Sequence, residues 1–288
     1  SMNPFSSRCC QHNHAQGWPY FTEHLVLATP DNGVATAIYA ACKATVKVGD
    51  GKEITLHEET NYPFEEAIAF TVSTGEKVAF PFYLRIPSWT QKAEVRVNGK
   101  KVSAAPVAGK YLCINREWAN GDRVELTLPM SLSMRTWQVN KNSVSVDYGP
   151  LTLSLKIAEK YVEKDSRETA IGDSKWQKGA DSKKWPTTEI YPDSPWNYSL
   201  VLDKKEPLKN FKVVRKSWPA DNFPFTVANV PLEVKATGRI IPEWQIDETG
   251  LCGVLPEEDA VKGAKEEITL IPMGAARLRI SAFPNTKE

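Results

Sequence analysis

The stretch VAFPFYLRI, residues 78–86, decides the fold class because a hydrophobic side chain occupies every second position. This alternation has the period of a β-strand with one buried face. Similar alternation recurs on both sides of the stretch, at residues 54–56, 68–72, 95–97 and 124–128. Asn98-Gly99 suits the positive φ angles of a tight hairpin. The pattern therefore predicts an antiparallel β-sandwich over residues 31–135.

Pro81 interrupts the deciding stretch. Proline has no N–H to donate to a strand ladder, so its presence predicts an edge strand or a bulge at this position.

A second block rich in strands follows. Hydrophobic and polar residues alternate over 151–157, and strand patterns return at residues 198–203, 230–234, 268–270 and 278–280. Between residues 159 and 184 the sequence is charged and poor in hydrophobic residues. We expect a second β-sandwich over 136–288 that carries a charged, aromatic-bearing insertion at about 158–197.

A helix is expected near the start of the chain. Pro19 suits a first helical turn, while Trp18, Phe21, Leu25 and Ala28 recur at helical spacing. A helix of about 11 residues cannot bury its apolar face alone. Residues 1–30 are therefore interpreted as the remnant of a larger helical body, and the expected class is mostly β, two sandwiches preceded by one helix.

Composition excludes several functions. The 288 residues carry 36 basic and 35 acidic side chains, a net charge of +1, so we expect no nucleic-acid partner. No apolar run approaches the roughly 20 residues of a membrane span, so no membrane partner is expected. No leader pattern opens the chain, and the compartment stays open between cytoplasm and periplasm. Five cysteines do not form a disulfide framework in a chain of this length.

The adjacent Cys9 and Cys10 are the one cysteine pattern with a chemical interpretation. Thiolate is both a nucleophile and a zinc ligand. Zinc normally takes four ligands, of which this pair supplies at most two, although His12 and His14 are close in sequence. On spacing alone, two ordinary thiols remain the favoured interpretation.

Other catalytic candidates are weaker. Glu58 and Glu59 are neighbours in a predicted strand, so their side chains point to opposite faces and cannot act together on one sugar. His24 is interpreted as a packed or capping residue, and His57 as an exposed residue. Serine-hydrolase, Walker and dinucleotide-binding motifs are absent from the sequence.

An aromatic cluster includes Trp176, Trp185 and Trp196. Aromatic faces can stack on sugar rings, which makes these tryptophans candidates for carbohydrate binding. Large rings also hold loops against sheets, and this packing role is the favoured alternative.

The segment from Arg8 to Asn13, followed by Gly17-Trp18-Pro19, resembles the Cys-Cys-x-x-Asn region of glycoside hydrolase family 127. The resemblance covers about residues 8–157 and is looser beyond them. Its further landmarks are NYPF at 61–64, LRIPSW at 84–89, VNG at 97–99, NREW at 115–118, NGD at 120–122 and YGPL at 148–151. The order and spacing of these landmarks make the resemblance fairly specific.

The resemblance implies a retaining β-L-arabinofuranosidase of bacterial type with an (α/α)6 barrel ahead of the two sandwiches. It implies that Cys9 is the nucleophile and Cys10 a zinc ligand, with Cys9 also contacting the metal. The acid/base glutamate, the glutamate ligand and a third cysteine would precede residue 1. A plant-derived oligosaccharide or glycoside is the implied substrate.

Because those groups are missing, we expect the 288-residue chain alone to be inactive and to bind zinc weakly or not at all. The alternative is a pair of sandwiches that binds carbohydrate or has only a structural role.

Overall fold

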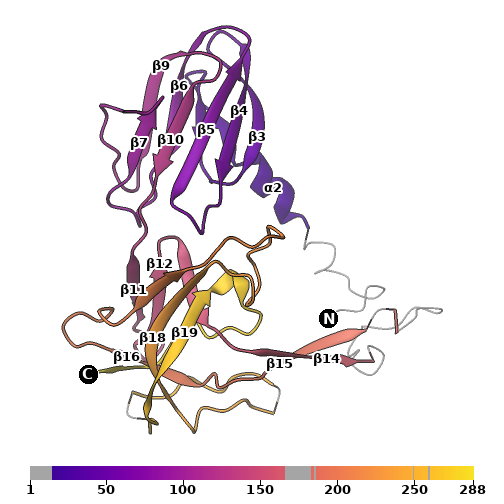
Figure 1. The fold of residues 1–288 in the computed structure, drawn as a ribbon, viewed down its shortest axis with the longest axis vertical. Helices are drawn as coiled ribbons and strands as arrows, with labels where there is room; N and C mark the ends of the chain where they lie inside the picture. The colour runs from indigo at the N-terminus through magenta and orange to yellow at the C-terminus, as the bar shows by residue number, and fades with distance from the viewer. Residues whose placement is uncertain (1–14, 166–182, 185, 249, 259) are drawn as a thin grey trace. The chain divides into compact units, whose positions relative to one another are not determined.

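The computed structural model describes residues 15–165, 183–184, 186–248, 250–258 and 260–288. These residues form two compact units, which divide between Ser131 and Leu132. Figure 1 shows that each unit is built from β-strands. No helix among the described residues is long and apolar enough to cross a bilayer.

The helix at the start is shorter than expected. α2 (Gly17–Glu23) has no buried residue, and Trp18 is 66% exposed. It ends where the His24 amide donates to Phe21 O at 3.3 Å. The expected continuation to Ala28 is wrong, because Val26–Ala28 forms strand β1 and pairs with Val34–Thr36. A ladder to a neighbouring strand outweighs the helical spacing of these residues.

The first unit contains two sheets. Their order is β1-β2-β6-β9 in one and β3-β4-β5-β10-β7-β8 in the other. The four-stranded sheet consists of β1, β2 (Val34–Thr36), β6 (Val78–Arg85) and β9 (Tyr111–Trp118). The six-stranded sheet consists of β3 (Cys42–Val48), β4 (Lys52–Thr60), β5 (Ala67–Thr74), β10 (Arg123–Thr127), β7 (Glu94–Val97) and β8 (Lys100–Lys101).

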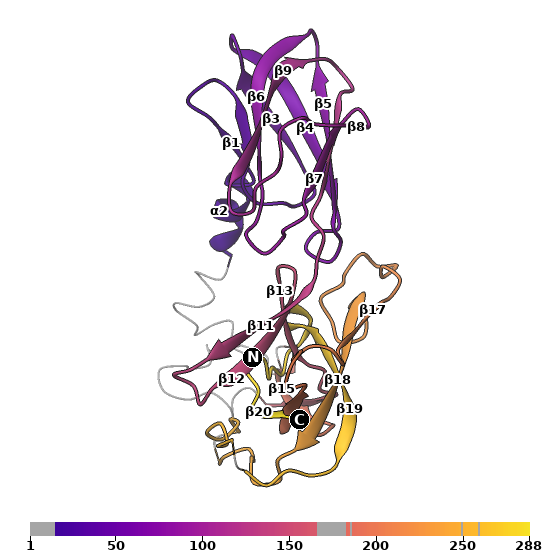
Figure 2. The same cartoon turned by 90° about the vertical axis from the view of Figure 1, so that its left-hand side faces the viewer.

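Hydrophobic side chains from both sheets form one core. Phe82 of β6 meets Phe70 of β5 edge to face, with ring centroids 5.4 Å apart. Trp118 is fully buried, stacks on Phe80 and donates from Nε1 to Phe80 O at 3.0 Å. Figure 2 shows the unit from the side, with β6 and β9 running together. The predicted alternation at residues 78–86 is therefore the buried face of a sandwich.

The edge strand that the sequence predicts at Pro81 is wrong, because Pro81 lies in a strand with a partner on each side. β6 pairs with β9 along its whole length and with β2 on its other side. The β2 partners are Phe82–Leu84 alone, so Pro81 lies just outside that ladder. A missing N–H is tolerated there because no β2 residue faces it.

The second unit is built around one eight-stranded sheet. Its order is β11-β12-β13-β19-β18-β16-β20, with β17 also paired to β18. The strands are β11 (Leu132–Trp137), β12 (Ser143–Tyr148), β13 (Leu151–Leu155), β19 (Lys265–Pro272), β18 (Leu232–Ile240), β16 (Tyr198–Leu202), β20 (Asn285–Lys287) and β17 (Lys212–Arg215). A short 3₁₀ helix, η1 (Met273–Ala275), follows β19.

The C-terminal segment links two strands that are far apart in the order of this sheet. β20 pairs in parallel with β16, and Phe283 just before it exchanges two 2.9 Å hydrogen bonds with Val144 of β12. The sheet is thus rolled, and Phe283 is fully buried inside it. β11 remains the terminal strand of the sheet.

The charged insertion begins and ends as a two-stranded ribbon. β14 (Glu159–Lys164) pairs antiparallel with β15 (Thr187–Pro192) (Figure 1). Residues 166–182 and 185 lie outside the described residues. The mostly β class predicted from the sequence is confirmed by this strand content.

Candidate functional site

Most of the predicted site residues lie outside the described part of the chain. This is the case for Cys9 and Cys10, and for Trp176 and Trp185. Trp196 is the one predicted site residue whose surroundings can be given. Among the described residues, no group of three His, Cys, Asp or Glu side chains could hold a metal ion.

The three cysteines among the described residues are free thiols. Cys113 and Cys252 are exposed, and Cys42 is half-buried. Burial and the nearby Glu58 raise the pKa of Cys42 to about 11. A catalytic thiol needs a lowered pKa, so Cys42 does not have that role.

Glu58 is a buried acid inside the first sandwich. It lies on the core face of β4, with only 1% of its surface exposed, and Cys42 Sγ donates to its Oε2 at 3.9 Å. Burial raises its pKa to about 8, even though the Ala40 amide and Cys42 donate to it. Its Oε1 has no hydrogen-bond partner among the described residues. The group is therefore a neutral carboxylic acid at pH 7, out of reach of any substrate.

Sequence analysis named Glu58 as a weak catalytic candidate and did not predict that it is buried. The pattern placed Ile54 and Leu56 on the buried face of the strand, and Glu58 is the next position on that face. The alternation along this strand could therefore have predicted that Glu58 is buried.

Trp196 lines a pocket of about 310 Å³ in the second unit. Its ring is half-buried and meets Trp244 at 5.1 Å between centroids, with the planes 66° apart. Most of the wall is apolar, and includes Ile157, Leu278 and Ile280. Two cationic residues, Arg277 and Arg279, complete the lining. This volume is at the lower end of the range for small-molecule sites.

A hydrogen-bonded loop forms one wall of this pocket. Ile246 and Cys252 form a bridge across the loop, and the Asp247 amide donates to Leu251 O at 2.8 Å. Trp244 holds the base of the loop by donating from Nε1 to Gly253 O at 3.0 Å. The wall is therefore fixed by its own backbone contacts.

A larger groove of about 510 Å³ crosses β4, β5, β10 and β7 in the first unit. Arg96 contacts Glu94 at 2.6 Å, and Arg123 contacts Glu59 at 3.4 Å. Glu65 and Glu125 also line the groove, so its described lining has more carboxylates than guanidinium groups.

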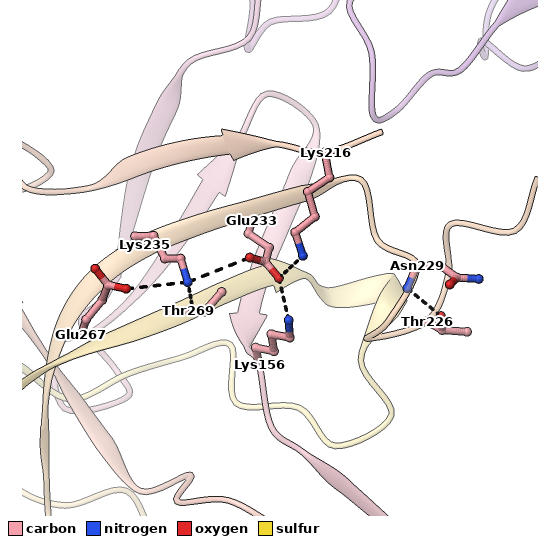
Figure 3. Close-up of polar contacts among 8 residues, drawn as sticks. All are labelled: Lys156, Lys216, Thr226, Asn229, Glu233, Lys235, Glu267 and Thr269. Carbon is pink, nitrogen blue, oxygen red and sulfur yellow. Dashed lines mark hydrogen bonds and ion pairs between the residues drawn. The ribbon is translucent and has the colours of Figure 1, made fainter. Parts of the chain in front are cut away.

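Figure 3 shows a cluster of three lysines around Glu233. Lys156 and Lys216 each donate to Glu233 Oε1 at 2.6 Å, while Lys235 contacts Glu233 and Glu267. Burial raises the pKa of Glu233, but the hydrogen bonds from Lys156 and Lys216 outweigh it, so this pKa lies below its ordinary value. Because these lysines already share carboxylate partners, the cluster ties the residues that directly follow β13 and β17 to β18.

The sequence of the first unit matches a known family. Residues 33–130 match the model for the "Beta-L-arabinofuranosidase, GH127 middle domain". Residues 33–130 are a family 127 middle domain. The resemblance to glycoside hydrolase family 127 expected from the sequence is thereby confirmed.

Solved structures share the fold of the chain. One is a GH127 β-L-arabinofuranosidase from Geobacillus stearothermophilus T6, with a TM-score of 0.62 and 21% identity over 96% of this chain and 37% of that one. Another is a glycoside hydrolase, with a TM-score of 0.63 and 21% identity over 98% of this chain and 40% of that one. A third is a GH127 β-arabinofuranosidase, with a TM-score of 0.62 and 21% identity over 96% of this chain and 38% of that one.

The chain therefore spans 37–40% of the length of these structures, and at 21% identity the likeness concerns the fold. No curated protein matches its sequence.

Proposed function

We propose that the whole protein is a retaining glycoside hydrolase acting on β-L-arabinofuranosides or a related plant-polysaccharide sugar. Cys9 is its nucleophile and Cys10 one of its zinc ligands, with the remaining ligands and the acid/base glutamate on residues outside this chain. The observation that carries the proposal is the family 127 middle domain at residues 33–130, placed directly after the Cys9-Cys10 pair and its helix.

The proposed chemistry follows from the properties of sulfur. A thiolate is a strong nucleophile, and it can replace the carboxylate that usually attacks the anomeric carbon. Bound zinc would keep a neighbouring thiol ionised at neutral pH. Burial and Glu58 raise the pKa of Cys42, which is the opposite of what a nucleophilic thiol needs.

Hydrolysis of an aryl β-L-arabinofuranoside tests this proposal. We expect the whole protein to release the aryl group and Cys9→Ala to lower kcat at least about a thousandfold, as loss of a nucleophile does. Cys113→Ala is the matched control, because this exposed thiol lies in the first sandwich and should leave kcat unchanged. Equal activity of the two variants would refute the assignment of Cys9.

The same preparations test the metal and the fragment. Cys10→Ala should lower the zinc content of the whole protein relative to Cys252→Ala, measured by elemental analysis. The 288-residue chain alone should show no hydrolysis and little zinc. Tight zinc occupancy or turnover by this chain would contradict the proposal that essential groups lie outside it.

A second candidate function is carbohydrate binding at the Trp196 pocket. The observation that favours it is the pocket itself, in which an indole and the Tyr191 ring line an apolar hollow of about 310 Å³. Aromatic rings and a few polar groups are what a sugar site of this kind needs. This function is compatible with hydrolysis elsewhere in the protein.

A further inference from the structure

We propose that the Trp196 pocket binds a carboxylated sugar, a hexuronic acid unit, with Arg277 and Arg279 selecting its carboxylate. The inference rests on the second candidate function, carbohydrate binding, and names the chemical class of the ligand. It does not depend on hydrolysis or on Cys9.

The charge of the pocket is the first argument. Two arginines line it, and none of the described residues of its lining is acidic. Neither guanidinium pairs with a carboxylate among the described residues. The pocket therefore presents uncompensated positive charge next to an apolar surface, and an anion is the complementary ligand.

Glu159 contacts the backbone of Arg277 but forms no ion pair with its guanidinium. Glu159 accepts the backbone N–H of Arg277 at 2.9 Å through one oxygen, and the Tyr161 hydroxyl at 2.6 Å through the other. Both of its oxygens are thus engaged by groups other than the guanidinium. Glu159 positions the backbone at Arg277 and leaves the side chain free for a ligand.

The fixed orientation of Arg279 is the second argument. Its Nε donates to Ala276 O at 2.8 Å, a local contact that holds the guanidinium plane. The two terminal nitrogens remain as parallel donors, the arrangement that suits a carboxylate. Phosphate has the same charge preference, but the apolar walls favour a ligand with a hydrocarbon face.

The aromatic lining completes the match to a sugar ring. Trp196 is held against Trp244, so its orientation is fixed before a ligand arrives. Tyr191 stands on β15, 44% exposed, with its hydroxyl donated to Glu189 at 2.5 Å. One ring fixed by packing and one anchored by a hydrogen bond can accept the C–H face of a pyranose. Little side-chain freedom is then lost on binding.

A pair of matched sugars tests the inference. The full 288-residue chain is titrated with methyl α-D-galactosiduronate and with methyl α-D-galactoside, which differ in having a carboxylate or a hydroxymethyl group. Binding is followed by NMR through the indole N–H signal of Trp196. We expect the uronate to bind at least about tenfold more tightly than the neutral sugar.

Variants separate charge from folding. Arg277→Gln combined with Arg279→Gln should reduce uronate affinity to that of the neutral sugar, since both side chains are exposed and their loss leaves the fold intact. Arg123→Gln, an exposed arginine in the other unit, should change neither affinity. A dispersed, wild-type-like NMR spectrum of each variant establishes that it is folded.

Each other outcome overturns the inference in a distinguishable way. Equal binding of the two sugars would leave carbohydrate binding standing and refute selection by charge. Binding of neither sugar would refute both the inference and the second candidate function. Binding of benzoate in place of the uronate would show an acid pocket that is not a sugar site.

Discussion

At the scale of single residues, position within a strand decides the chemistry of Glu58 and Glu59. Glu58 faces the core of the first sandwich, and burial raises its pKa to about 8. Glu59, one residue on, is exposed and contacts Arg123. The same side chain is thus a neutral acid at one position and a solvated anion at the next.

We expect Glu58→Gln to stabilise the protein increasingly as pH rises from 4.5 to 8. The unfolded chain releases this proton near the ordinary pKa of 4.5, whereas the folded state holds it to about 8. The free energy of unfolding of the wild type therefore falls as pH rises through this window. That of the glutamine variant does not fall, because glutamine does not ionise. The gain at pH 8 should be about 4 kcal/mol and should nearly vanish at pH 4.5.

Urea unfolding at several pH values measures this effect. Glu59→Gln is the matched control on the exposed face of the same strand, and its stability should follow the wild type. Parallel pH profiles for wild type and Glu58→Gln would show that the acid is not held neutral in the fold.

At the scale of elements, a glycine sets how closely β2 approaches β6. A Cβ added at Gly33 would lie 2.2 Å from Pro81 O and 2.6 Å from Pro81 Cγ. The first of these is a backbone atom of β6, so it cannot move aside without displacing the strand. The Gly33 carbonyl also accepts the Thr29 amide at 3.1 Å, which fixes the turn between β1 and β2.

Gly33→Ala should therefore destabilise the first sandwich by about 1–3 kcal/mol, the usual cost of overpacking a core. Gly75→Ala is the control, because its added Cβ would meet no atom within 4 Å. Thermal unfolding of both variants makes the comparison. A Gly33→Ala variant as stable as Gly75→Ala would mean that β2 and β6 are not this close.

The alternation of hydrophobic and polar residues predicted the strands well, because residues 78–86 and 54–56 repeat with the period of two that a β-strand has. The alternation of residues does not show which strands become neighbours. The prediction at Pro81 was therefore an edge strand or a bulge, although β6 lies between β2 and β9. The sequence pattern also extended the helix through Val26–Ala28, where pairing with β2 prevails. Partners distant in sequence decide both features, and local patterns carry no record of them.

The candidate site was harder to predict than the fold. The Cys-Cys motif and the tryptophans could be named from their residue types. Their geometry depends on residues that are distant in sequence or lie outside the described part of the chain. The pocket at Trp196 gathers residues from 157 to 280, including Arg277 and Arg279, and no spacing in the sequence brings them together.

At the scale of the whole molecule, the chain end completes the second unit. Phe283 is fully buried and bridges to Val144, while β20 continues along β16. These contacts join segments that are more than 80 residues apart, so the unit cannot close its sheet before its last residues are in place. The C-terminal segment is a structural element of the second unit.

We expect Phe283→Ala to lower the free energy of unfolding by about 3–5 kcal/mol, because it removes a large buried ring at the point of closure. The loosened segment would uncover the edges of β12 and β16, so the variant should also aggregate more readily than wild type. Val254→Ala is the control in the same unit, since that side chain is 84% exposed. Urea unfolding and light scattering measure the two effects. If Phe283→Ala unfolds like Val254→Ala, the rolled sheet does not depend on the chain end.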